Sequence, residues 1–108
     1  MLKRENRLGE ISLKKPRLIS SKLFNIKFSK NGQEINRFAF VVSKRIDKRA
    51  TVRNRIRRVT RSCVEEIFGD IKKGHDFIFY LKEESIGVPR EEISQTIKKT
   101  FSENKLLI

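Results

Sequence analysis

The chain has 108 residues, and 37% of them are hydrophobic, which suits one compact domain over residues 1–108. Its 26 lysines and arginines against 13 acidic residues give a net charge of +13, so a polyanion is the natural partner. The sequence has no apolar run long enough to span a membrane, no apolar signal-peptide core and only one cysteine. We therefore expect a cytoplasmic protein with no membrane partner and no internal disulfide.

The N-terminal half predicts an arm followed by two strands. Residues 1–20 are expected to form the arm, with a short helix. Residues 22–29 and 37–43 alternate between apolar and polar positions, as half-buried strands do. Turn-forming residues at 30–33 separate them, which predicts that the two strands pair as a hairpin.

Residues 51–68 predict an amphipathic helix. The apolar positions recur at spacings of four, three, four and four, which is typical of a buried helical stripe: Val52, Ile56, Val59, Cys63 and Ile67. Because Cys63 lies on this stripe, we interpret it as a small core residue and not as a nucleophile. Nine basic residues lie between Lys44 and Arg61, with Asp47 as the single acid.

The basic residues of this helix form two neighbouring rows. One row contains Arg53, Arg57 and Arg61, and the other contains Asn54, Arg58 and again Arg61. Like charges at these spacings cost roughly 0.2–0.5 kcal/mol per pair, a cost that a bound array of phosphates would reverse. A merely solvated charged face would normally mix the two signs.

The C-terminal third predicts a buried strand and a second helix. Residues 75–81 are almost continuously apolar, which indicates a central strand. Pro89 then begins a helix whose core face repeats every four residues at Ile93, Ile97 and Phe101. The single histidine, His75, has no second histidine or cysteine nearby, and the chain has no phosphate-binding glycine loop. We therefore expect no catalytic residue and no metal site in the protein itself.

A longer pattern is recognisable in the middle of the chain. The run Phe38-Ala39-Phe40-Val41-Val42-Ser43-Lys44-Arg45, then Ala50, then Arg53-Asn54-Arg55-Ile56-Arg57-Arg58 and Arg61, closely resembles the signature of the protein subunit of bacterial ribonuclease P. The resemblance extends to Asn6-Arg7-Leu8, Leu23-Phe24, Gly74-His75-Asp76 and the closing helix.

This resemblance implies a fold class, α+β. It implies one two-layer domain with a small mixed sheet, helices on one face and a left-handed crossover at the basic helix, like ribosomal protein S5 domain 2. Physical reasoning alone would not give that handedness, because crossovers of this kind are nearly always right-handed.

The resemblance also implies a function. In such proteins a catalytic RNA subunit binds the basic segment, here Lys44, Arg45, Lys48, Arg53, Asn54, Arg55, Arg57, Arg58 and Arg61. The RNA and its Mg²⁺ ions remove the 5′ leader of precursor tRNA, and the protein assists by binding the leader. The leader would lie between the N-terminal helix and the exposed face of the sheet, near Arg7, Asn25, Lys27, Ala39, Val41 and Ser43.

The sequence departs from the family pattern in this leader site. The segment from Leu8 to Phe24 is shorter than expected, contains Pro16 and has aliphatic residues where the family has two aromatic ones. Lys27 occupies a strand position that often holds an aromatic residue. We therefore expect phosphate contact to replace base stacking at that position.

Two other classes of function remain open on the sequence. A ribosome-associated protein that binds ribosomal RNA would share the fold and the charge. A DNA-binding regulator would read base edges with a few residues at a helix start and would usually be a dimer. Repeated arginines with one asparagine favour phosphate-rich recognition of RNA, so we expect no DNA partner.

Overall fold

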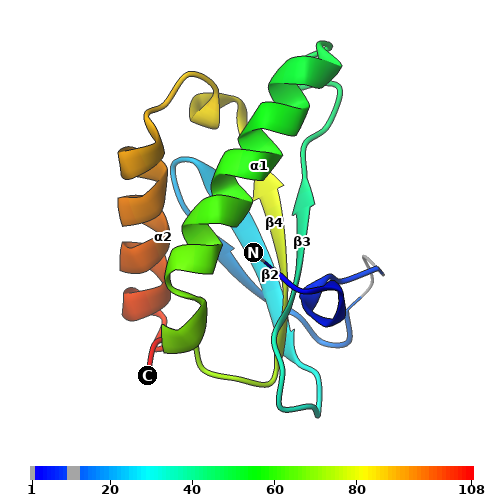
Figure 1. The fold of residues 1–108 in the computed structure, drawn as a ribbon, viewed down its shortest axis with the longest axis vertical. Coiled ribbons are helices and arrows are strands. Elements are labelled where there is room, and N and C mark those ends of the chain that lie inside the picture. Colours follow the sequence, from blue (N-terminus) through cyan, green and yellow to red (C-terminus); the bar gives the residue numbers. More distant parts are fainter. Residues whose placement is uncertain (1, 10–12) are drawn as a thin grey trace.

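The computed structural model describes residues 2–9 and 13–108 (Figure 1). In chain order the described elements are η1 (Arg4–Asn6), β1 (Arg17–Ser20), β2 (Phe24–Lys30), β3 (Arg37–Val41), α1 (Ala50–Glu66), η2 (Phe68–Asp70), β4 (His75–Leu81), η3 (Glu83–Ser85) and α2 (Arg90–Glu103). The predicted α+β class is confirmed: a mixed sheet carries both α-helices on one face (Figure 1).

The sheet has the order β1-β2-β4-β3, so the predicted hairpin is wrong. β4 lies between β2 and β3, antiparallel to β2 and parallel to β3. The reason is burial: Phe77, Ile78 and Phe79 are all 0% exposed, so β4 is buried on both of its faces. A central strand has a neighbouring strand on each edge, and the side chains of these neighbours help to cover both faces. The prediction that residues 75–81 form a central strand is confirmed.

The connection from β3 through α1 to β4 is left-handed. Figure 1 views the sheet from the side of α1, with β3 and β4 both pointing upward and β4 to the left of β3. A right-handed crossover seen this way would step to the right. The handedness implied by the family resemblance is therefore confirmed.

The core lies between the sheet and the two helices. Phe24, Ile26 and Phe28 of β2 point into it, and the ring of Phe77 stacks 5.2 Å from that of Phe101 on α2. The predicted helical stripes are confirmed, because Ile56 and Cys63 are buried and Ile93, Ile97 and Phe101 are buried as well.

The N-terminal segment differs from the predicted arm. Among its described residues the helical part is the 3₁₀ turn η1. The Leu8 amide then donates to the Phe38 carbonyl at 2.8 Å, and Arg7 bridges to Phe38, which extends the sheet beyond β3. Residues 17–20 form the edge strand β1, with Ile19 buried and Leu18 63% exposed. Residues 10–12 of the predicted arm lie outside the described residues. Within the described ranges, neither α-helix nor any 3₁₀ turn has the length and apolar character to cross a membrane.

Candidate nucleic-acid interface

Helix α1 begins without the usual capping residues. Arg49 occupies the N-cap position and makes no side-chain cap, and the first turn contains no acid. Asp47, two residues earlier, holds the N-cap residue in place: its Oδ1 accepts a hydrogen bond from the Arg49 amide at 2.8 Å. Its carboxylate also accepts from the Arg49 guanidinium at 3.0 and 2.8 Å. These hydrogen bonds lower the pKa of Asp47 to about 2.

Arg53 holds the loop that precedes α1. Its Nη1 donates to the carbonyl oxygens of Asp47 and Lys48, both at 2.8 Å. The side chain is half-buried as a result. The sequence predicted Arg53 as an RNA contact. Its hydrogen bonds to the loop could not be predicted from the helical spacing.

Arg57 and Arg61 complete the first predicted row. Arg57 donates from Nη1 to Asn54 Oδ1 at 2.8 Å, so the two predicted rows are joined by a hydrogen bond. The Arg61 guanidinium lies 5.6 Å from the ring centroid of Phe40, a cation–π contact on β3. Arg57 and Arg61 are therefore fixed by neighbours and partly exposed.

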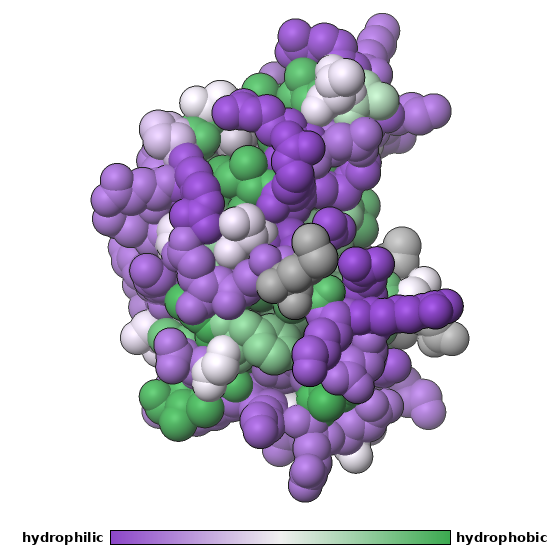
Figure 2. Space-filling view, viewed as in Figure 1, coloured by the Kyte–Doolittle hydropathy of each residue, from purple (hydrophilic) through white to green (hydrophobic). Residues whose placement is uncertain are grey.

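The other predicted RNA contacts are exposed. They comprise the turn after β3 and the outer side of α1: Lys44, Arg45, Lys48, Asn54, Arg55 and Arg58. Figure 2 shows hydrophilic side chains over the upper part of the molecule, where α1 begins in Figure 1. The structure thus gathers all nine predicted residues around the first turns of α1 and the loop before it.

The basic surface stops before the end of α1. Glu66 forms an ion pair with Arg90 of α2 and accepts a hydrogen bond from Ser94 at 3.2 Å. The hydrogen bond from Arg90 lowers the pKa of Glu66. These contacts join the two helices, so this end of α1 serves packing.

The face of the sheet opposite the helices carries most of the predicted leader residues. The strand register aligns Leu18, Lys27, Ile78 and Ala39 in one row, and Ser20, Asn25, Tyr80 and Val41 in the next. We call these two rows the open face. Ser43 lies beyond the end of β3, where its Oγ accepts from the Arg45 amide at 3.0 Å. Arg7 pairs with the outer edge of β3 and is not part of either row.

Tyr80 is an open-face residue that the prediction missed. The Lys27 ammonium lies 5.5 Å from its ring centroid. The neighbouring Asn25 has a buried side-chain oxygen with no hydrogen-bond partner. The sequence could have predicted this position, because alternation along residues 75–81 places Tyr80 on the face opposite Phe77 and Phe79.

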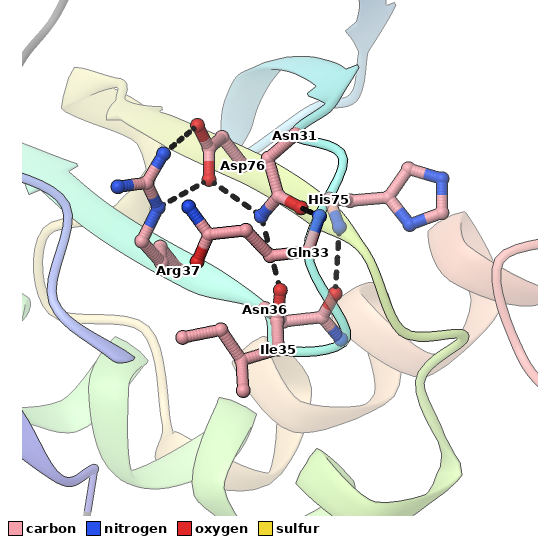
Figure 3. A network of polar contacts seen from close by, with 7 residues as sticks. All are labelled: Asn31, Gln33, Ile35, Asn36, Arg37, His75 and Asp76. Carbon is pink, nitrogen blue, oxygen red and sulfur yellow. Dashed lines mark hydrogen bonds and ion pairs between the residues drawn. The ribbon is translucent and has the colours of Figure 1, made fainter. Parts of the chain in front are cut away.

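A polar network anchors one end of the open face (Figure 3). The Asp76 carboxylate accepts from Arg37 at 2.8 and 2.7 Å and from Asn31 Nδ2 at 2.9 Å. Beside it, the His75 amide donates to Asn36 Oδ1 at 3.0 Å. The network ties the turn between β2 and β3 to the start of β4.

This network requires a glycine and gives His75 a packing role. Gly74 has φ of 89°, and a Cβ there would lie 2.9 Å from the Gln33 carbonyl oxygen. The His75 ring lies 5.6 Å from Phe77 and 6.1 Å from Phe28. Among the described residues no group of three or more His, Cys, Asp or Glu side chains is placed to hold a metal ion.

Comparison with known proteins gives a consistent result. A family model described as Ribonuclease P matches residues 2–105. The chain is 28% identical over 94 residues to the ribonuclease P protein component of Alkaliphilus oremlandii, covering 87% of this chain and 82% of that protein. It is 32% identical over 68 residues to the component of Synechocystis sp., covering 63% of this chain and 55% of that protein.

Solved structures resemble the fold. The ribonuclease P protein of Thermotoga maritima aligns with a TM-score of 0.72 and 25% identity, covering 79% of this chain and 80% of that one. The Staphylococcus aureus protein aligns with a TM-score of 0.76 at 19% identity, covering 87% and 85%. The match spans little more than half the length of two of the curated relatives, 55% and 53%.

Proposed function

The chain belongs to the ribonuclease P protein family, and on this premise we propose that it is the RNA-binding protein subunit of a ribonuclease P ribonucleoprotein. In that role it binds the catalytic RNA subunit and assists removal of the 5′ leader from precursor tRNA. The proposed role places it in the cytoplasm, as part of an endoribonuclease whose protein does not supply the catalytic groups.

One observation carries the proposal: the concentration of positive charge at the start of α1. Nine basic residues lie between Lys44 and Arg61, and Asp47, the one acid among them, is engaged by Arg49. The segment therefore presents almost uncompensated positive charge. Each cation that contacts a phosphate releases condensed counterions, so this surface suits the backbone of a folded RNA.

The open face supports the second half of the proposal, contact with the leader. It lies on the side of the sheet that the helices leave uncovered, and it combines the exposed Lys27 with partly exposed Ala39, Val41 and Tyr80. Positive charge beside apolar and aromatic surface is what proteins use to bind single-stranded nucleic acid. We therefore assign the catalytic RNA to the basic segment and the leader to the open face.

The chemistry is assigned to the RNA. The described residues do not offer a cluster of metal ligands, and His75 is engaged in packing. We propose that Mg²⁺ ions held by the RNA subunit activate the water that cleaves the phosphodiester. The protein holds the substrate in place, and its contribution is to affinity and orientation.

Reconstitution tests this division of labour. The purified protein, an RNA subunit from a bacterial ribonuclease P and a precursor tRNA are combined at moderate Mg²⁺. We expect cleavage at the mature 5′ end with both subunits present and none with the protein alone. Cleavage by rigorously RNA-free protein would refute the proposal, as would co-sedimentation with ribosomal particles in place of the catalytic RNA.

A further inference from the structure

The aromatic residues of this chain are distributed unequally between the two sides of the sheet. The sequence contains eight phenylalanines, one tyrosine and no tryptophan. The strand phenylalanines all point to the helix side, where Phe38 and Phe77 stack at 5.1 Å and Phe77 meets Phe101. Tyr80 is the aromatic residue that the described strands place on the open face.

Tyr80 is a partly exposed residue with apolar neighbours on the open face. Ile78, two residues earlier on the same face, is 0% exposed yet does not belong to the helix-side core. Val41 is the register partner of Tyr80 on β3 and is half-buried. These neighbours are apolar, and Tyr80 is the aromatic side chain that the described strands place beside them.

The Lys27 side chain lies over the ring of Tyr80. Its ammonium lies 5.5 Å from the ring centroid, across the diagonal between β2 and β4. A cation at an exposed site holds such a ring weakly. A nucleobase can take that place on the ring, and the flexible lysine stem can carry the ammonium to a neighbouring phosphate.

Asn25 provides an independent observation at the same place. It is the register partner of Tyr80 on β2, and its side-chain oxygen is buried without a hydrogen-bond partner. Unpaired buried oxygens are unfavourable, so this amide gains a hydrogen bond if it turns toward a donor. Ribose hydroxyls and exocyclic amino groups are the donors that an RNA strand offers.

Resting on the proposed leader-binding function, we propose that an unpaired nucleobase of the leader stacks on Tyr80, with Lys27 on an adjacent phosphate and Asn25 as a hydrogen-bond partner. Tyr80 is a substrate-positioning residue in this scheme. The aromatic platform, absent from position 27 of β2, is supplied by β4. Because every base has a flat face, the contact is tolerant of leader sequence.

Tyrosine fluorescence gives a direct test. With one tyrosine and no tryptophan, the tyrosine emission of the full chain reports on Tyr80 alone. Titration with a short single-stranded RNA should quench this emission, and an abasic oligonucleotide of the same length should bind with little quenching. In Lys27→Ala the affinity should fall while the quenching at saturation persists. Binding of the intact oligonucleotide without quenching would refute the stacking.

Substrate affinity in the holoenzyme gives the second test. One stacked base contributes roughly five- to a hundred-and-fiftyfold in affinity. Tyr80→Leu should therefore weaken binding of precursor tRNA about tenfold and leave mature tRNA unchanged, and Tyr80→Phe should keep the wild-type preference. Unchanged binding of the catalytic RNA by all variants shows that they fold.

The two proposals fail in different ways. If the wild-type holoenzyme binds precursor and mature tRNA equally, the leader function and the Tyr80 assignment both fall. If the wild type prefers the precursor and Tyr80→Leu keeps that preference, the Tyr80 assignment alone is refuted.

Discussion

Arg53→Ala is expected to affect stability and RNA binding together. The Arg53 guanidinium holds the Asp47 and Lys48 carbonyl oxygens in the loop before α1. This helix has no side-chain cap at Arg49, so the loop depends on such contacts for its conformation. Removal of the guanidinium frees the loop and also deletes one cation from the basic segment.

The magnitude follows from the two hydrogen bonds that are lost. Each contributes a net ~0.5–1.5 kcal/mol, and partial exposure to solvent favours the lower half of that range. We expect the free energy of unfolding to fall by about 1–2 kcal/mol. For a domain of this size that corresponds to a decrease in Tm of roughly 5–10 °C.

Arg57→Ala is the matched control. It removes the same side chain from the same helix, but among the described residues the Arg57 guanidinium donates to the exposed side chain of Asn54 and to no backbone carbonyl. We expect its effect on stability to be below about 0.5 kcal/mol. Both variants should weaken binding of the catalytic RNA and flatten its log–log salt dependence by about one unit for each lost phosphate contact.

Thermal unfolding of the free protein and salt titration of RNA binding are the two assays. The expected result is a lowered Tm for Arg53→Ala alone, with a flattened salt dependence in both variants. Equal melting temperatures would show that the carbonyl contacts of Arg53 do not stabilise the fold. If neither variant changes the salt dependence of RNA binding, α1 is not part of the RNA interface.

Three further predictions concern anions, acid and the polar network. Pyrophosphate at a hundredfold excess over its Kd should stabilise the protein by about 2.7 kcal/mol, which raises Tm by roughly ten degrees beyond the effect of chloride at matched ionic strength. This gain in Tm should be smaller in the double variant Arg57→Ala/Arg58→Ala. An equal effect of chloride would exclude a specific anion site. The pKa of Asp47 lies at about 2, below its ordinary 3.8, so its contribution to stability is present above pH 4 and is lost as pH falls toward 2. Acid titration at low salt should show a smaller loss over that window for Asp47→Asn, and parallel curves would contradict this. Asp76→Ala leaves Arg37 and Asn31 without a shared acceptor, and because Arg37 is partly exposed we expect a loss of about 2–3 kcal/mol in urea unfolding; a change below about 0.5 kcal/mol would show that the network is dispensable.

The sequence by itself determined the features that depend on neighbouring residues. Apolar spacing predicted both α-helices and their buried faces, because one helical turn brings residues three and four apart to the same side. The continuous apolar run at residues 75–81 predicted a central strand, and the charge pattern from Lys44 to Arg61 predicted the basic surface. Each of these signals lies within a short window of the chain, whereas the left-handed crossover was implied only by the family resemblance.

Only the tertiary structure decided how the segments combine. The turn-forming residues 30–33 favoured a hairpin of β2 and β3, but β4 lies between these two strands. Both faces of β4 are buried, and the apolar surface buried at a central position stabilises the fold more than a local turn does. The short edge strand β1 has a single buried residue, Ile19, which is too little pattern to detect. The Arg53 contacts and the pairing of Tyr80 with Lys27 depend on groups brought together by the loop path and the strand register. Such contacts form only when the chain folds, since the residues that make them are set by packing and not by sequence spacing.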